Sequence, residues 1–469
     1  MPIPDRPLAP RQSIMTTRET PPVEGIPYVP GVVRGVLCRD RHKLVAGKLC
    51  ILSQRDILEV VGTRGAGDAL LAEQLRGVGI LAVGGAPLSH PMIRLLGLGV
   101  PTVIVSAAQL SGLTEGVELV LDGATGRVAG SAQGAPAARA SEPPVPRAGS
   151  PVLTADGVEV RLNASVAGVR GAANAVAQGA AAIGLIRSEY LLPADDIPSR
   201  ADDFESLLET LCTAAQPLAL TLRLLDVAAG KLPAWRARLA GSEGPLGLRG
   251  TQLYATEPVR SVYRAQVQAV GRLAGRFALS LLLPNVSGPA EFRRWRTEIE
   301  QLLPRPVPIG AMAETPAAAL ALGETLKIAD FVALGCNDLM QCFFGVDRDI
   351  PEVSEFLDPC APALFCFLRQ VAEAAGEAVG EVQLCGLLPQ SPGILPVLLG
   401  LGYRRFSVEP VVIPYLARTI GAVRMGSAEA LAAAVCAAPD AEGVRLVLGL
   451  LRGSAWGIGA QALPPAPAP

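Results

Sequence analysis

The feature that most constrains the fold is a series of eight short apolar segments between residues 158 and 425, most of them followed by a helix-forming stretch. Apolar runs without alternating polar residues are typical of parallel strands that are covered on both faces. Eight such strands alternating with helices over roughly 270 residues predict an α/β protein with a (β/α)8 TIM barrel. The segments are residues 159–163, 182–185, 218–222, 278–283, 307–312, 331–334, 382–385 and 406–408.

The rest of the sequence divides around this predicted barrel. At 469 residues the chain is longer than one ordinary domain. Residues 23–130 hold short apolar runs between Gly, Pro and Asp turns, with helical stretches near 66–75 and 91–98, which predicts a small α/β domain. We expect a disordered tail at 1–22, a flexible linker at 131–150, the barrel at 151–425, and two short helices with an unstructured end at 426–469.

Composition argues against several classes of function. The net charge is −2, only 18% of residues are charged and 4% are aromatic, so we expect no nucleic-acid partner. No apolar run approaches the length of a membrane span, and the first 22 residues do not resemble a signal peptide, so we expect no membrane association. The nine cysteines include no CxxC pair, which favours reduced thiols in a cytoplasmic protein.

Two acids follow neighbouring predicted strands. Glu314 follows the run 307–312, and Asp338 follows the run 331–334. The carboxyl ends of barrel strands open on one mouth, so both carboxylates would face a single site. With no Cys or His cluster nearby, a pair of carboxylates suits an oxygen-preferring cation such as Mg²⁺. The alternative is that both acids only cap the helices that follow them.

Five basic residues also fall in loops that follow strand ends. A ring of cations beside two carboxylates is suited to a polyanionic substrate bound with Mg²⁺, because guanidinium groups pair bidentately with phosphate and carboxylate oxygens. The alternative for each residue is a solvated surface charge. The five are Arg187, Arg223, Lys231, Arg249 and Arg348.

Two further residues are candidates for proton or phosphoryl transfer. Cys385 ends the seventh strand near these arginines and is a candidate proton donor with a lowered pKa, or else a small buried residue. His90 follows a Gly-rich turn and lies at the start of an apolar helix, where free N–H groups would stabilise a phosphate carried on its ring. The alternative for His90 is a structural role. The only other histidine, His42, is flanked by basic residues and is expected to be exposed.

Together these motifs resemble the phosphoenolpyruvate-utilising enzymes, and most of all Enzyme I, the phosphoenolpyruvate-protein phosphotransferase of the bacterial phosphotransferase system. The resemblance covers about residues 25–425. It is carried by Glu-Thr-Pro-Ala-Ala-Ala from Glu314, Gly-Cys-Asn-Asp-Leu from Gly335, Val-Asp-Arg ending at Arg348, Gly-Leu-Ile-Arg-Ser-Glu from Gly184, Leu-Cys-Gly from Leu384, and Ser89-His90.

The resemblance implies a mechanism in the cytoplasm. Phosphoenolpyruvate would be held in the barrel mouth, with Mg²⁺ on Glu314 and Asp338. The N-terminal domain would be a swivelling phosphohistidine domain that brings His90 to the substrate, with the linker as its hinge. Cys385 would protonate the enolate to give pyruvate. The phosphoryl group would pass to a phosphocarrier protein, and the barrel would form a homodimer. The substrate-binding residues implied are Arg187, Arg223, Lys231, Arg249, Asn337 and Arg348.

The chain also departs from the family pattern. Residues 25–130 leave no room for the helical insertion with which Enzyme I docks its carrier, and Leu387 stands where the family typically has an acid. An alternative function is therefore a phosphoenolpyruvate-binding regulatory or degenerate homologue without turnover. A third is a lyase or hydrolase acting on a related small phosphorylated or 2-oxo acid, for which His90 would be dispensable.

Overall fold

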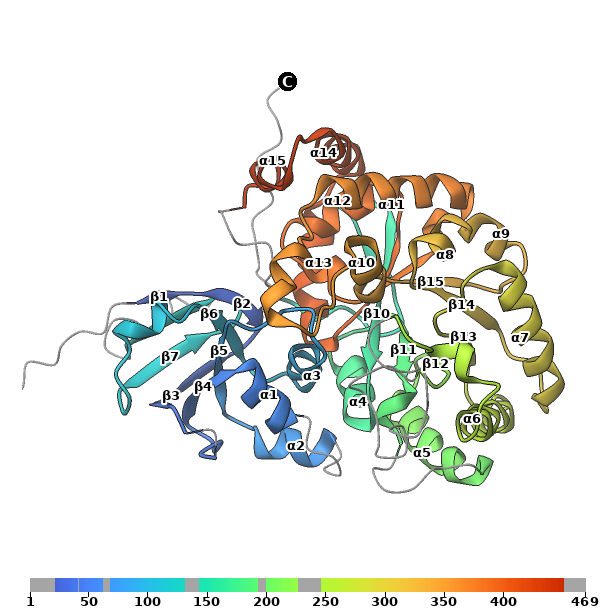
Figure 1. Ribbon diagram of the computed structural model, residues 1–469, viewed down its shortest axis with the longest axis horizontal. Helices are drawn as coiled ribbons and strands as arrows, with labels where there is room; N and C mark the ends of the chain where they lie inside the picture. Colours follow the sequence, from blue (N-terminus) through green and yellow to red (C-terminus); the bar gives the residue numbers. More distant parts are fainter. Residues whose placement is uncertain are drawn as a thin grey trace, which may run out of the picture.

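The computed structural model describes residues 22–40, 42–61, 68–130, 143–192, 200–226 and 246–450. These residues form two β-sheets, one of eight strands near the N-terminus and one of nine strands that includes the barrel. Figure 1 shows the N-terminal sheet, in blue and cyan, beside the larger helix-covered barrel. The tail 1–21, the linker segment 131–142 and the end 451–469 lie outside the described residues.

The N-terminal sheet is mixed. Its strand order is β1-β8-β7-β3-β4-β5-β6-β2, with β3 to β6 parallel and the four other strands antiparallel to their neighbours. The strands are β1 (Val23–Glu24), β2 (Ile26–Val29), β3 (Val32–Cys38), β4 (Lys48–Ser53), β5 (Gly79–Val83), β6 (Thr102–Val105), β7 (Glu118–Asp122) and β8 (Arg127–Gly130).

Three α-helices accompany this sheet: α1 (Gln54–Val61), α2 (Asp68–Gln74) and α3 (His90–Leu98). The sequence pattern predicted the second and third but missed α1. Helix α3 starts at His90, with Ser89 before it in extended conformation and Pro91 in its first turn, a position that suits proline because its missing N–H has no helical partner there. Helix α3 ends at Gly99, which has the positive φ of 68° that favours glycine.

The second sheet contains a closed parallel barrel. Each of the eight strands from β10 to β17 pairs in parallel with the next, and β17 pairs with β10 to close the ring. The prediction of a (β/α)8 barrel is confirmed. The strands are β10 (Glu159–Val166), β11 (Ile183–Arg187), β12 (Leu220–Arg223), β13 (Leu279–Leu283), β14 (Ile309–Ala313), β15 (Val332–Gly335), β16 (Gln383–Cys385) and β17 (Arg405–Val408), with β9 (Val152–Leu153) antiparallel to β10.

Helices surround the barrel in the described part of the chain (Figure 1). The helical segment between β14 and β15 is two short helices that break at Ala321, and α10 was not predicted. The helices are α4 (Val169–Ala177), α5 (Ala201–Ala214), α6 (Val259–Leu273), α7 (Pro289–Leu302), α8 (Pro316–Leu320), α9 (Leu322–Leu326), α10 (Cys336–Phe344), α11 (Pro362–Ala375), α12 (Ile394–Gly400), α13 (Ile413–Ala422), α14 (Met425–Ala437) and α15 (Ala441–Val447).

The barrel strands are buried on both sides, as their apolar runs predicted. All five residues of β14 are buried. A small cluster of Leu185, Leu282, Met312, Ala333 and Cys385 packs together, separately from the large core that the strands share with the helices. Among the described residues no single helix has the length and apolar character to cross a membrane; the bent pair 410–422 and 425–437 meets those two criteria only when taken together.

The packing of α14 on α12 generates a prediction about stability. A Cβ atom at Gly400 would lie 2.1 Å from the carbonyl oxygen of Ala428, so Gly400→Ala forces the two helices apart. We expect a loss of about 1–3 kcal/mol in the free energy of unfolding, measured by urea denaturation. Gly421→Ala in α13 is the matched control, because no atom lies within 4 Å of its added Cβ. Equal losses in both variants would contradict the prediction.

Candidate active site

A cavity of about 460 Å³ opens at the carboxyl ends of the barrel strands. It contains eight of the ten residues that the sequence singled out, and one of them, His90, comes from the N-terminal sheet unit. Arg249 lies beside the cavity and contacts one of its acids, and Lys231 lies outside the described residues. The eight are His90, Arg187, Arg223, Glu314, Asn337, Asp338, Arg348 and Cys385.

The two predicted acids share this cavity. Glu314 directly follows β14 and accepts a 2.8 Å hydrogen bond from the backbone N–H of Asn285. Gly335 allows its close approach, since a Cβ there would lie 2.6 Å from the Glu314 Oε1. Asp338 lies in the first turn of α10, three residues beyond β15. Burial, followed by the negative charges of Asp338 and Asp226, raises the pKa of Glu314 to about 7.

Arg223, the last residue of β12, is buried among three carboxylates. Its guanidinium lies 2.5 Å from Glu189, 3.1 Å from Asp226 and 3.7 Å from Glu314. Although burial opposes it, these negative charges raise the pKa of Arg223 well above its ordinary value. Glu189 closes the Gly-Leu-Ile-Arg-Ser-Glu motif and Asp226 lies three residues after Arg223, but the sequence analysis assigned a function only to the arginines.

Two further arginines share Asp338. Arg249 lies 2.9 Å from one of its oxygens, and Arg348 lies 3.1 Å from the other. The structure therefore brings these predicted cations against the predicted acids at one barrel opening. Sequence spacing placed both arginines in loops after strand ends, but it contained no information about which acid each would contact.

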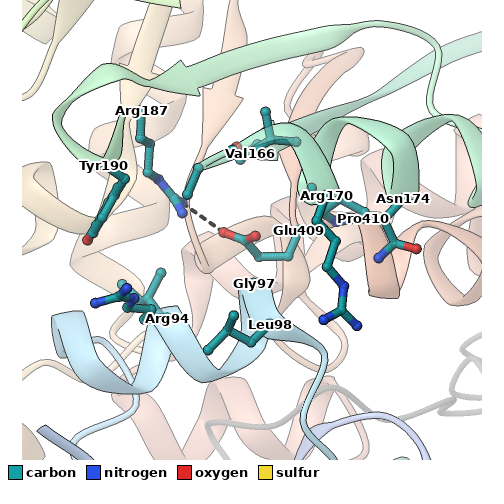
Figure 2. Close-up of a pocket in the computed structure, with 15 residues that line it drawn as sticks. Arg94, Gly97, Leu98, Val166, Arg170, Asn174, Arg187, Tyr190, Glu409 and Pro410 are labelled. Atoms are coloured by element: carbon teal, nitrogen blue, oxygen red, sulfur yellow. Dashed lines mark ion pairs between the residues drawn. The ribbon is translucent and has the colours of Figure 1, made fainter. Parts of the chain in front are cut away.

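Arg187 has a different partner. It ends β11, and its guanidinium lies 2.8 Å from Glu409, a buried acid directly after β17. Figure 2 shows the two side chains pointing toward one another above Gly97 and Leu98 of α3. Arg187 and Tyr190 line both the barrel cavity and this adjoining pocket, which lies between α3 and the barrel. Glu409 was not predicted as a site residue.

Cys385 lies at the floor of the cavity and requires a correction. Its Sγ lies 3.3 Å from the Nε2 of Gln383, which donates to it. Burial raises the pKa of the Cys385 thiol to about 12, where the sequence analysis expected a lowered pKa. Arg187 and Arg223 act in the lowering direction, but desolvation of the thiolate is the larger effect. Cys385 is therefore a neutral S–H group, which suits a proton donor.

Asn337 supports the turn beside Cys385. Its Oδ1 accepts a 2.9 Å hydrogen bond from the backbone N–H of Leu387. Gly386 between them has a φ of 102°, and a Cβ there would lie 2.6 Å from the same oxygen. Leu387, which stands where the family typically has an acid, thus lies in a turn beside the cavity that its hydrogen bond to Asn337 stabilises.

His90 is docked at the mouth. Its backbone N–H donates to Asp349 Oδ1 at 2.9 Å, and its Nδ1 lies 2.8 Å from Asp349 Oδ2. Its Nε2 lies 3.0 Å from a guanidinium nitrogen of Arg348, the nitrogen that also contacts Asp338. Asp349 follows Arg348 directly in the chain and was missed by the sequence analysis, although it extends the Val-Asp-Arg motif.

The donor set at the mouth fits a hard cation. Glu314 and Asp338 offer only carboxylate oxygens, and the described residues contain no group of three or more His, Cys, Asp or Glu side chains arranged to hold a metal. Mg²⁺ commonly takes one or two protein carboxylates and completes its coordination with water and substrate oxygens. A structural zinc site takes four protein ligands, mostly Cys and His, so two carboxylates do not form a site of that type.

The raised pKa of Glu314 generates a prediction about pH. An unfolded glutamic acid releases its proton near pH 4.5, whereas the folded chain keeps it to about pH 7. The folded state binds the extra proton in that window, so this group's contribution to stability falls as the pH rises from 4.5 to 7. In Mg²⁺-free buffer with chelator, the free energy of unfolding of the wild type should fall relative to Glu314→Gln between pH 5 and 7.5.

The exposed Glu355 provides a control, because Glu355→Gln should follow the wild type at every pH. Parallel curves for the wild type and Glu314→Gln would contradict the prediction.

Comparison with known proteins identifies the family of this chain. Residues 147–424 match the family described as "PEP-utilising enzyme, PEP-binding domain". The chain is 30% identical to a "Phosphoenolpyruvate-protein phosphotransferase" of Streptomyces coelicolor, covering 81% of this chain and 69% of that protein, and 30% identical to one of Haloferax volcanii, covering 82% and 70%. It is also 30% identical to a "Multiphosphoryl transfer protein" of Xanthomonas campestris over 78% of this chain, but spans only 46% of that relative's length. The chain belongs to the phosphoenolpyruvate-utilising enzymes.

Proposed function

We propose that this protein transfers the phosphoryl group of phosphoenolpyruvate to His90, releases pyruvate, and passes the phosphoryl group to a partner protein. The observation that carries the proposal is the position of the His90 Nε2, 3.0 Å from Arg348 at a cavity that also contains Glu314 and Asp338. A histidine from one folding unit thus reaches the charged mouth of another.

The cavity suits the two anionic groups of phosphoenolpyruvate. Guanidinium groups pair with phosphate and carboxylate oxygens in a fixed fork, and Arg223 and Arg348 both line the cavity. Arg187 and Asn337 also line it, and Arg249 reaches it through Asp338. Lys231 is assigned to the substrate by its motif alone. On substrate binding, the Arg348 guanidinium exchanges its contact with His90 for phosphate oxygens.

Glu314 and Asp338 would hold Mg²⁺. The ion would neutralise charge on the substrate's oxygens, which is a main requirement of phosphoryl transfer. Catalysis by the chain itself is then mostly a matter of position: the arginines hold the substrate in line with His90, and the docked α3 covers part of the mouth and limits the access of water.

Phosphoryl transfer and protonation of the enolate are two successive steps. The lone pair on His90 Nε2 forms a bond to phosphorus while the bond from phosphorus to the enol oxygen breaks, and its electron pair stays on the enolate. The Cys385 S–H then donates its proton to the methylene carbon, which gives pyruvate, and the thiolate recovers a proton from solvent. Burial keeps Cys385 protonated before this step, as the role requires.

The remaining parts of the proposal concern partners. The phosphoryl group would pass to a phosphocarrier protein after the N-terminal unit leaves the barrel, with residues 131–150 as the hinge. We further propose a homodimer formed through the barrel, in the cytoplasm. The phosphohistidine assignment and the hinge rest on the resemblance and on the docked position of His90.

Labelling tests the central step. Incubation with ³²P-labelled phosphoenolpyruvate and Mg²⁺ should give the wild type an acid-labile, base-stable label, as expected of phosphohistidine. His90→Ala should carry none, whereas His42→Ala, which changes the only other histidine, should label like the wild type. Calorimetric binding of phosphoenolpyruvate without any label would instead favour a regulatory protein without turnover.

Cys385→Ala separates phosphoryl transfer from proton transfer. The amount of label on His90 should stay within several-fold of the wild-type amount, because enolpyruvate can take a proton from water after release. Exchange of the methyl protons of pyruvate with solvent, catalysed by the phosphorylated protein, should fall about 10²-fold or more because it needs the thiolate as base. Cys336→Ala is the matched control, since Cys336 is equally buried but does not line the cavity. Full exchange by Cys385→Ala would overturn the assignment.

A further inference from the structure

Asp349 contacts two residues of the N-terminal unit, His90 and Gln54. Both of its carboxylate oxygens lie within 3.0 Å of His90 Nδ1, and one of them also accepts the backbone N–H of His90. Its own backbone carbonyl accepts a 3.1 Å hydrogen bond from the side chain of Gln54. Gln54 in turn accepts from the backbone N–H of Ala86, in the turn that leads to His90.

These contacts determine which ring nitrogen of His90 carries the proton. Arginine has N–H donors and no acceptor, so the Arg348 guanidinium can only donate to His90 Nε2. A nitrogen that accepts must hold its lone pair, and the proton of the neutral ring is then on Nδ1. The Nδ1–H group points at the Asp349 carboxylate, which accepts it at 2.8 Å.

Asp349 is charged in this arrangement. Burial opposes ionisation, but the hydrogen bonds that His90 donates and the positive charge of Arg348 hold the pKa of Asp349 well below its ordinary value. The Asp349 backbone N–H donates to Asp347 Oδ1 at 3.0 Å, which fixes the loop after α10. A fixed negative charge therefore lies against the Nδ1 edge of the ring, on a residue that does not line the cavity.

We infer that Asp349 is the positioning residue of His90: it holds the imidazole at the barrel mouth in the form whose Nε2 lone pair faces the substrate. The inference rests on the proposed function. As the bond from Nε2 to phosphorus forms and the bond to the enol oxygen breaks, positive charge spreads over the ring while Nδ1 keeps its proton. The Asp349 carboxylate stabilises that positive charge but does not remove the proton from Nδ1. The step requires no reactant other than phosphoenolpyruvate.

The tautomer is measured without any turnover. With only two histidines in the chain, ring-¹⁵N-labelled protein gives two sets of nitrogen signals, and His42→Ala assigns them. The wild-type His90 should carry its proton on Nδ1. The Nδ1–H proton should give a downfield ¹H signal, as expected of a hydrogen bond to a carboxylate at 2.8 Å. In Asp349→Ala this N–H loses its acceptor, so the signal should move upfield or disappear through exchange with water. A wild-type ring protonated on Nε2, or an Nδ1–H signal unchanged by Asp349→Ala, would overturn the inference.

The rate of phosphoryl transfer is the second measurement. In rapid-quench single turnovers, Asp349→Asn should label His90 about 10- to 100-fold more slowly, as expected for loss of a group that orients another. The dissociation constant for phosphoenolpyruvate, measured by calorimetry, should stay within about twofold, because Asp349 does not line the cavity. Asp349→Glu should recover part of the rate, since it restores the carboxylate.

Glu355→Gln provides the matched control in the same segment of chain, as an exposed acid whose change should leave rate and tautomer unaltered. A wild type that acquires no label defeats the proposed function, and the nitrogen signals still decide the role of Asp349. A wild type that labels at the same rate as Asp349→Asn defeats the inference alone.

Discussion

The charge balance at the barrel mouth is the constraint on which the rest of the site depends. Glu189, Asp226, Glu314 and Asp338 are buried close together, and the arginines that face them are Arg223, Arg249 and Arg348. A buried carboxylate without a partner is costly, so each arginine is required by the fold before any substrate arrives. Among these seven residues the acids exceed the arginines by one, and Arg187 with Glu409 adds one charge of each sign.

That excess explains why a cation belongs to the proposed chemistry. A substrate with a phosphate and a carboxylate would bring more negative charge to a mouth whose arginines are already paired. Burial, and after it this crowding of negative charge, raises the pKa of Glu314. A divalent cation on Glu314 and Asp338 would offset both, and it would release arginine donors from the acids toward the substrate.

The barrel and the meeting of eight candidate residues at its mouth followed from the sequence, whereas the contacts among those residues did not. Eight apolar runs identified eight strands because burial on both faces removes alternation, and the rule that strand ends share one mouth brought Glu314 and Asp338 together. Which arginine contacts which acid depends on neighbours across strands, so Glu189, Asp226 and Glu409 were not assigned.

Local pattern also misjudged two features of single elements. Asp338 follows the strand end as expected, but it lies in the first turn of α10, a helix that was missed because a helix that starts in a buried segment has no polar stripe to mark it. The pKa of Cys385 was expected to fall beside arginines, but full burial raises it. Both errors share a cause: the degree of burial is a property of the assembled barrel and not of the neighbouring residues in the sequence.

The contact between α3 and the barrel combines polar and apolar groups. At one end of α3 it includes the polar contacts of Asp349 and Arg348 with His90 and its neighbours. At the other end, Gly97 lies so near Glu409 that an added Cβ would be 3.2 Å from its carboxylate (Figure 2). Apolar residues of α3, among them Ile93 and Leu96, belong to the same buried cluster as the barrel core, so apolar packing also stabilises the docked position. The proposed function requires that this contact place His90 precisely, because a 1 Å error in placement is costly to phosphoryl transfer, and that it open when His90 meets its acceptor.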